Sequence, residues 1–264
     1  MMPNGAHEPH NEPNLPAQPL YADETPEDGS KWFLNNNYNH RDAAFEEIFH
    51  LVHDAGIGTY MQGALPDYQD AILEEAEKAI QDGRWGIEVD PSVADWIEEL
   101  RDEDSLAQEY IASVIDSYYG LWGAWNEGPG GMWGIYIAKT REEIAEKDPA
   151  GLALVEAFLP PLLDIEIRLD PLLDQNFQLH FDPSQPYTHK SQYFLNATLQ
   201  GNASIDLSGN EYDNVLRGNS GDNRILGGDG DDTVVYCSPQ GEYSLQVVDN
   251  AVVEVTGPDG VDQL

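Results

Sequence analysis

Residues 209–235 read GNEYDNVLR GNSGDNRIL GGDGDDTVV, three consecutive nonapeptides whose opening glycines recur at 209, 218 and 227. Such a period predicts stacked units that each supply one tight turn and one short strand, a parallel β-roll. Glycine suits the turns because it tolerates positive φ and close backbone approach. The eighth residue of each unit is apolar and points between the strands. We expect these three side chains to be the whole core: Leu216, Ile225 and Val234.

A core this thin cannot offset the backbone entropy lost on folding, about 1–2 kcal/mol per residue. Calcium ions can hold such turns, because Ca²⁺ accepts about six to eight oxygen ligands from carbonyls and carboxylates. We therefore predict Ca²⁺ as the cofactor of this segment. The predicted ligands are the sixth residue of each unit, the opening glycines and one further acidic residue: Asp206, Asn214, Asn223, Asp229, Asp232, Gly209, Gly218 and Gly227.

The units differ in the charge of position six, the sixth residue. Residues 201–208 (GNASIDLS) look like a unit that is one residue short, with Asp206 in that place. Asparagine at positions 214 and 223 keeps an oxygen ligand but removes its charge, so we expect weaker calcium binding there than at Asp232. Acidic neighbours such as Asp213 and Asp222 are expected to compensate in part.

Residues 199–236 resemble the RTX, or hemolysin-type, calcium-binding repeat family of secreted bacterial proteins. The resemblance implies a β-roll that folds on binding calcium and an extracellular location. The N-terminus lacks a secretory signal, and the family is typically exported by a C-terminal signal. Because the chain stops just after a new turn at Pro258, we expect a fragment whose export signal is missing. The alternative, a flexible Gly/Asn/Asp-rich linker, does not explain the regular spacing of the aliphatic residues.

The overall charge also bears on the partners of the chain. The formal net charge is −37, with 49 acidic and 12 basic residues. This balance makes nucleic acid or an anionic membrane an unfavourable partner and favours cations, although adaptation of the surface to a saline habitat is an alternative. No apolar run approaches the roughly 18 residues that span a bilayer. The single cysteine, Cys237, excludes an intrachain disulfide.

A second metal site is predicted on a helix over residues 42–55. Its sequence EEIFH is similar to HExxH, in which two ligands lie one helical turn apart and the glutamate between them activates a zinc-bound water. Glu46 takes the place of the first ligand, Glu47 that of the general base and His50 that of the second ligand. Glutamate replaces the first histidine, which makes the metal a weaker Lewis acid. His53 is an alternative ligand.

A second helix, over residues 104–119, carries Glu109. Together, EEIFHLVHD and AQEYIASVID resemble the anthrax lethal-factor-like zincin metallopeptidases over residues 30–160. That resemblance implies Glu109 as the third Zn²⁺ ligand and a peptide or protein substrate. Two further interpretations stay open: a degenerate zincin with a binding or structural role, which we favour, and a polar helix face without metal.

These observations predict an α+β protein in two parts, a mainly helical zincin-like domain followed by a short parallel β-roll with a flanking β-hairpin. Helices are also expected over 68–82, from 90 and over 140–147, and from 148 to a stop at 160–161. The predicted boundaries are a disordered lead at 1–30, the helical domain at 31–161, an extended strap at 162–198, the roll at 199–236 and the hairpin at 237–264.

Overall fold

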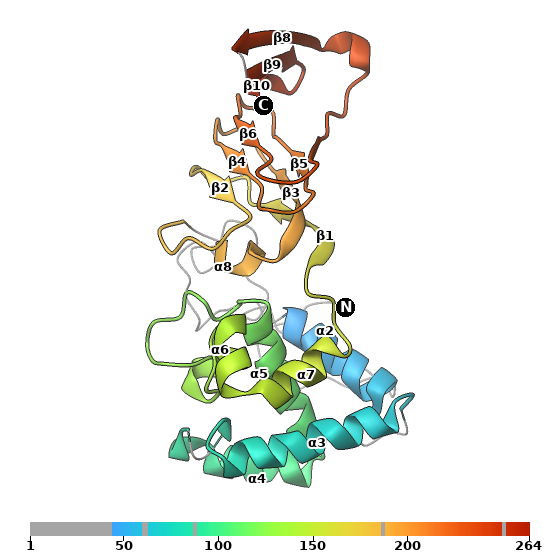
Figure 1. Ribbon diagram of the computed structural model, residues 1–264, viewed down its shortest axis with the longest axis vertical. Helices are drawn as coiled ribbons and strands as arrows, with labels where there is room; N and C mark the ends of the chain where they lie inside the picture. Colours follow the sequence, from blue (N-terminus) through green and yellow to red (C-terminus); the bar gives the residue numbers. More distant parts are fainter. Residues whose placement is uncertain (1–43, 60–62, 87–88, 186–187, 250–251) are drawn as a thin grey trace, which may run out of the picture. The chain divides into compact units, whose positions relative to one another are not determined.

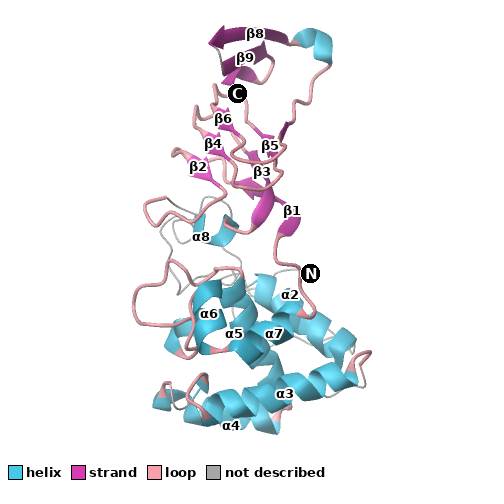
Figure 2. Cartoon of the chain, in the orientation of Figure 1, coloured by secondary structure: helices cyan, strands magenta, loops and turns pink. Residues whose placement is uncertain are grey.

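A computed structural model describes residues 44–59, 63–86, 89–185, 188–249 and 252–264. The predicted lead at 1–30 lies outside them. The described chain forms two compact units that divide between Pro160 and Pro161. The first is helical and the second contains the strands (Figures 1 and 2), which confirms the predicted α+β layout. Within the described ranges, no helix combines the length and apolar character needed to cross a membrane.

The helical unit is built around one buried helix, α5. It contacts α2, α3, α4, α6 and α7, and of its residues every one except Glu109 is buried. A helix surrounded in this way has apolar or small side chains on most of its circumference. The α-helices described in this unit are α2 (Ala44–Val52), α3 (Pro66–Gln81), α4 (Ala94–Asp102), α5 (Leu106–Tyr118), α6 (Arg141–Lys147) and α7 (Pro149–Glu156).

Helix α2 differs from its prediction at the C-terminal end. The α-helix ends at Val52 and continues as a π-helix, His53–Gly58. Two glycines, Gly56 and Gly58, lower the α-helical propensity of this turn, and Gly58 has a φ of +108°. The chain then folds back, since the N–H of Ala64 donates to the carbonyl of Gly56 at 2.6 Å.

The parallel strands of the second unit form two sheets, ordered β1-β3-β5-β7 and β2-β4-β6. Successive strands alternate between the sheets, so each repeat strand pairs with the strand two units away. Leu207 lies opposite Ile225, and Leu216 opposite Val234. The strands are β1 (Leu163–Leu169), β2 (Phe177–Gln178), β3 (Phe194–Leu199), β4 (Leu207–Ser208), β5 (Val215–Arg217), β6 (Ile225–Leu226) and β7 (Thr233–Val234).

The core between these sheets is larger than predicted. Leu216 and Ile225 are buried in it, whereas Val234 is only partly buried. The prediction of a three-residue core is therefore wrong, because β1, β2 and β3 begin in the segment predicted as a strap, 162–198, and stack with the repeats. The buried members are Leu169, Leu173, Phe177, Leu179, Ala197, Leu199, Ile205, Leu207, Leu216 and Ile225.

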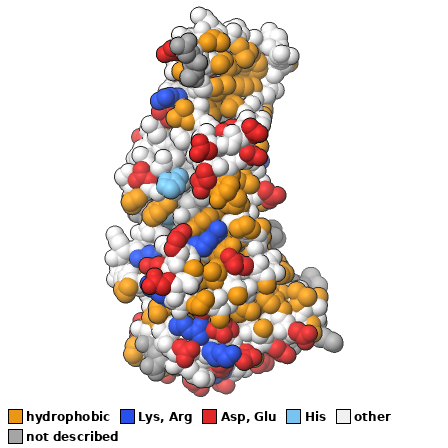
Figure 3. Space-filling view, in the orientation of Figure 1, with side chains coloured by type: hydrophobic (Ala, Val, Ile, Leu, Met, Phe, Trp, Pro, Cys, Tyr) orange, Lys and Arg blue, Asp and Glu red, His pale blue; other side chains and the backbone are white. Residues whose placement is uncertain are grey.

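A third sheet, antiparallel and ordered β10-β9-β8, follows the repeats. It consists of β8 (Ser244–Asp249), β9 (Val252–Gly257) and β10 (Gly260–Gln263). The first two strands occupy the predicted hairpin, and β10 adds a third strand to it. Leu245 and Val247 on β8 are exposed, and hydrophobic side chains gather over this sheet in Figure 3.

Candidate calcium-binding turns and a candidate metal cluster

Two stacks of turns connect the parallel sheets. In the first stack, turn 227–232, which joins β6 to β7, lies on turn 209–214, which joins β4 to β5. In the second, turn 218–223, which joins β5 to β6, lies on turn 200–206, which joins β3 to β4. The stacking follows from the alternate pairing of the strands, and it brings together residues 18 positions apart, such as Asn214 and Asp232.

Carboxylates hold turn 227–232 against turn 209–214. The N–H of Asn214 donates to Oδ1 of Asp232 at 2.9 Å, and the N–H of Asp231 donates to Oδ1 of Asp213 at 2.8 Å. One residue further, the N–H of Thr233 donates to the carbonyl of Asn214 at 2.8 Å. Two carboxylates from different turns therefore lie where these turns meet. We call such a contact between two stacked turns a step.

Glycine is required at this step because the backbones nearly touch. Gly228 has a φ of +110°, and a Cβ there would lie 2.1 Å from the carbonyl oxygen of Asn210. Gly230 has a φ of +102°, and its Cβ would lie 2.9 Å from the carbonyl oxygen of Tyr212. The step thus gathers backbone carbonyls with the carboxylates of Asp213 and Asp232. This set of hard oxygen donors fits Ca²⁺.

Asparagine replaces aspartate at position six of the two other units. Its amide group donates a hydrogen bond to a carbonyl that lies 18 or 19 residues earlier in the chain. Nδ2 of Asn214 donates to the carbonyl of Leu195 at 3.2 Å. Nδ2 of Asn223 donates to the carbonyl of Ile205 at 2.9 Å. Both asparagines are buried. Their amide groups therefore bond to these carbonyls directly, without an ion between them.

Two further asparagines, which are not among the predicted ligands, reinforce these contacts. Nδ2 of Asn210 donates to the carbonyl of Phe194 at 3.0 Å, and Nδ2 of Asn219 donates to the carbonyl of Ala203 at 3.0 Å. Both lie at position two of a unit, where the 227–235 unit has glycine. The repetition of asparagine at this position was the signal available in the sequence.

The structure brings each opening glycine against the position-six side chain of its own unit. A Cβ at Gly209 would lie 2.1 Å from Oδ1 of Asn214. The corresponding distances are 2.6 Å for Gly218 and Oδ1 of Asn223, and 1.9 Å for Gly227 and Oδ2 of Asp232. Asp229, another predicted ligand, is exposed in turn 227–232.

Asp206 does not occupy position six of its turn, contrary to the predicted register. Leu207 pairs with Ile225, which places Ile205 rather than Asp206 in line with Asn223. The 201–208 unit is one residue short, so its alignment with the later units depends on which side chain enters the core, and Ile205 is buried. The N–H of Asp206 instead donates to Oδ1 of Asn176 at 3.0 Å.

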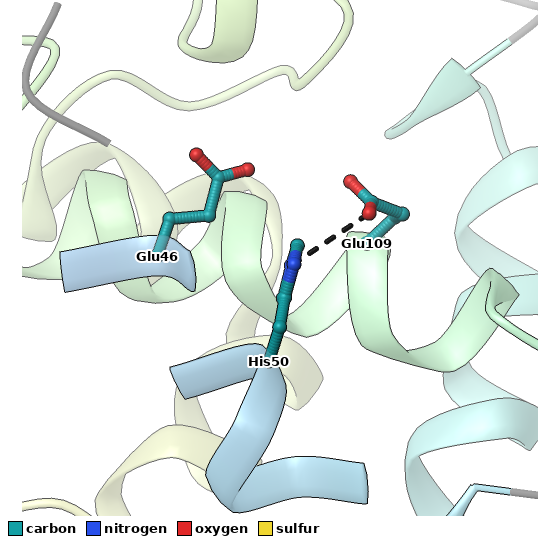
Figure 4. A group of neighbouring side chains, drawn as sticks. All are labelled: Glu46, His50 and Glu109. Carbon is teal, nitrogen blue, oxygen red and sulfur yellow. Dashed lines mark ion pairs between the residues drawn. The ribbon is translucent and has the colours of Figure 1, made fainter. Parts of the chain in front are cut away.

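In the helical unit, Glu46 and His50 of α2 meet Glu109 of α5. Each offers one ligand atom, and these atoms all lie within 4.8 Å of one another. Figure 4 shows the two carboxylates on either side of the tip of the His50 ring. The spacing of four residues places Glu46 and His50 on one face of α2, and Glu109 is the residue of α5 that is not buried.

The ring of His50 lies between carboxylates at both nitrogens. Nδ1 is 3.5 Å from Oε2 of Glu47 and Nε2 is 3.7 Å from Oε1 of Glu109. Burial alone would lower the pKa of His50, but the interaction with Glu47 and the charges of Glu109 and Glu46 raise this pKa to about 9. The site therefore attracts positive charge.

Two other predicted residues lie beside the cluster. Nε2 of His53 is 2.5 Å from Oε1 of Gln69, so this histidine contacts a polar partner on α3. Glu47 approaches Nδ1 of His50 from the same helix. Glu109 also lines a groove of about 770 Å³, together with Asp54, Trp96, Glu99, Leu100, Glu103, Asp104, Ser105 and Gln108.

Comparison with known proteins agrees with part of these predictions. The family model described as RTX calcium-binding nonapeptide repeat (4 copies) matches residues 208–236. No curated protein and no solved structure matches the chain. The match confirms the predicted RTX calcium-binding repeats, and such repeats bind Ca²⁺. The comparisons give no support to the predicted zincin-like resemblance of residues 30–160.

Proposed function

We propose that this chain is a secreted calcium-binding protein whose roll becomes ordered when Ca²⁺ binds to the repeat turns. The observation that carries the proposal is the step between turns 209–214 and 227–232, where Asp213 and Asp232 meet backbone carbonyls across glycines. The family match over 208–236 supports the same segment. Extracellular modules bind Ca²⁺ with Kd of about 10⁻⁴–10⁻³ M, so the turns would stay empty in the cytosol and fill outside the cell.

Electrostatics gives the reason why binding and folding are coupled. Turn 227–232 contains Asp229, Asp231 and Asp232 without a basic residue. Like charges at this spacing oppose the packed turn, whereas a divalent cation reverses their effect. Because the complete donor set exists only when two turns are stacked, the free energy of Ca²⁺ binding contributes to the free energy of folding.

Calcium titration of the full chain tests this proposal. Far-UV circular dichroism should gain β-sheet signal as Ca²⁺ rises through the millimolar range, and Asp232→Asn should shift the midpoint to at least about tenfold higher Ca²⁺. Asp174→Asn, an exposed carboxylate outside the repeats, should leave the midpoint unchanged. A roll that keeps the same β-sheet signal and protease resistance in EGTA would contradict the proposal.

For the helical unit we propose a transition-metal site, Zn²⁺ with Glu46, His50 and Glu109 as ligands. Imidazole nitrogen and carboxylate oxygen are both common zinc ligands, and the ligand atoms already lie within 4.8 Å of one another. Glu47, 3.5 Å from Nδ1 of His50, suits a carboxylate that fixes the orientation of a metal-binding histidine. This placement favours the binding or structural role of a degenerate zincin.

Zinc analysis tests this site independently of the roll. Purified protein dialysed against trace Zn²⁺ should retain about one ion per chain, and His50→Ala should lose it. His180→Ala, an exposed histidine of the other unit, serves as the matched control. Retention of zinc by His50→Ala, or none in the wild type, would refute the site.

The second candidate function is a zinc-dependent metallopeptidase with Glu47 as the general base. The groove beside Glu109 favours it, because five of its lining residues are acidic and would attract a basic peptide. Under this candidate, Glu47→Gln abolishes cleavage of an unstructured Lys-rich protein and leaves zinc binding intact. Under the positioning role, the wild type does not cleave it and Glu47→Gln weakens zinc binding about 10–100-fold.

A further inference from the structure

We propose that residues 257–264 form a further repeat unit of the roll, and that their turn and turn 218–223 form a second calcium-binding step with Asp262 as its position-six ligand. The inference rests on the proposed calcium binding of the first step. Neither the antiparallel pairing of β10 with β9 nor the family match at 208–236 includes this unit in the roll.

The sequence of this segment is GPDGVDQL. Aligned with the 227–235 unit, Gly257 is at position one, Gly260 at position four, Asp262 at position six and Leu264 at position eight. The apolar residue and both of these glycines are in place, and proline replaces the glycine of position two. The 21 residues before the unit, 236–256, interrupt the period, which conceals the match in the sequence.

Hydrogen bonds between the turns reproduce those of the first step. The N–H of Asn223 donates to Oδ1 of Asp262 at 3.0 Å, as that of Asn214 does to Asp232. The N–H of Val261 donates to Oδ1 of Asp222 at 3.0 Å, the counterpart of the bond from Asp231 to Asp213. The partners are 39 residues apart instead of 18, a difference of 21 that equals the length of the interruption.

The strand and the core are continued in the same way. The N–H of Gln263 donates to the carbonyl of Asn223 at 2.8 Å, and Gln263 forms a parallel bridge with Arg224 beside β6. Leu264 is partly buried against the roll core, as is Val234 at position eight of the 227–235 unit. Gly260 has a φ of +107° and its Cβ would lie 2.4 Å from the carbonyl oxygen of Gly221.

The carboxylate oxygen atoms at this step are suited to binding a cation, whereas the amide groups at the other steps donate hydrogen bonds. Asn214 and Asn223 each donate an amide hydrogen to a carbonyl 18 or 19 residues earlier. Asp232 and Asp262 occupy the same place in the next turns, and a carboxylate has no hydrogen to donate. A bound Ca²⁺ would satisfy each of these carboxylates. Asp262 is only 1% exposed, and a buried carboxylate needs hydrogen bonds, such as the one from Asn223, or a cation to compensate its charge.

Isothermal calorimetry of the full chain with CaCl₂ tests the inference. The wild type should bind about two Ca²⁺. Asp262→Asn and Asp232→Asn should each lose one ion and keep the other, whereas Glu254→Gln on β9 should bind as the wild type does. If the wild type binds no Ca²⁺, the proposed function itself fails. If it binds and Asp262→Asn keeps the full stoichiometry and affinity, only the further unit is refuted.

Hydrogen exchange of the wild type tests the inference without a variant, so the result does not depend on whether Asp262→Asn folds. Addition of Ca²⁺ should slow exchange of the amides of Asn223, Val261 and Gln263 by at least about tenfold, along with those of Asn214 and Asp231. Protection confined to turns 209–214 and 227–232 would overturn the inference while leaving the proposed function in place.

Discussion

At the scale of single residues, position six decides how each turn of the roll is held. A carboxamide carries both an acceptor and a donor, so Asn214 accepts the N–H of Asn210 at 2.8 Å and donates to Leu195. A carboxylate can only accept. The asparagines of two units therefore supply hydrogen bonds that need no ion, in addition to the weaker calcium binding that their lack of charge predicts. The sequence could not reveal this, because the accepting carbonyls belong to residues brought near only by the fold.

Asn214→Asp should make the roll more dependent on calcium. In EGTA the new carboxylate faces the carbonyl of Leu195 and loses a buried hydrogen bond, which should lower the free energy of unfolding by about 1–3 kcal/mol. Urea denaturation in EGTA and in saturating Ca²⁺ measures the difference. Asn202→Asp, an exposed position, is the control, and an equal loss in both variants would contradict the assigned role of Asn214.

His189 predicts a specific response to acid. It is 1% exposed in α8 (Thr188–Ser191), and burial, with a smaller effect of Lys190, lowers its pKa to about 3. Because the folded pKa lies below the ordinary value of about 6.5, this contribution to stability is complete above pH 6.5 and is lost as the pH falls toward 3. The slope should reach about 1.4 kcal/mol per pH unit.

Urea denaturation at saturating Ca²⁺ between pH 7 and 5 measures that slope. His189→Gln, which cannot titrate, should reduce it, whereas His180→Gln should leave it unchanged because His180 is exposed. Equal slopes in the wild type and His189→Gln would show that His189 has the same pKa in the folded and the unfolded chain, and would contradict the prediction.

At the scale of secondary-structure elements, the sequence predicted most helices to within a few residues because apolar spacing and caps mark them directly. Asp148 illustrates this: its side chain accepts the N–H of Gly151 at 3.3 Å as the N-cap of α7. The π-helix at His53–Gly58 and the register of the 201–208 unit were not predicted. The π-helix contains two glycines and is followed by a contact from Ala64 back to Gly56, and the register depends on the burial of Ile205; neither contact is marked in the sequence.

Asp148 also links several elements of the helical unit. It is fully buried and accepts hydrogen bonds from the hydroxyls of Tyr110 at 2.8 Å and Tyr136 at 3.0 Å, and from Arg84. Asp148→Ala should lower the free energy of unfolding of this unit by about 3–5 kcal/mol. Asp82→Ala removes a more exposed partner of the same arginine and should cost less than about 1 kcal/mol. Equal losses in a urea titration would disprove the linking role.

At the scale of the whole molecule, the net charge of −37 means that salt could order the roll by general screening. Specific calcium binding must be distinguished from this effect. Acidic side chains lie on the surface of both units in Figure 3. If the roll is held by Ca²⁺ at defined steps, a few millimolar CaCl₂ should order it, whereas about 1 M KCl, which reduces the Debye length to about 3 Å, should not. Circular dichroism with MgCl₂ as a second control measures this. Full ordering by KCl alone would favour the saline-surface alternative.

The two candidate sites differed in how far they could be predicted. The nine-residue period predicts the repeats, and the four-residue spacing on one helix predicts that Glu46 and His50 lie together. Glu109 could be chosen only through a resemblance, since nothing in the sequence shows that α5 crosses α2. Residues 257–264 escaped prediction as part of the roll because the interruption breaks the nine-residue period.

The return of the chain to the roll after residues 236–256 has a consequence for its evolution. Closing a loop of 39 residues rather than 18 adds only about 0.7 kcal/mol of entropy, because that entropy grows with the logarithm of loop length. The hairpin can therefore be exchanged, lengthened or replaced by a grafted domain at little entropic cost, provided that the chain on either side of it still packs on the neighbouring turns of the roll. A roll of this kind is a scaffold that accepts insertions between its turns.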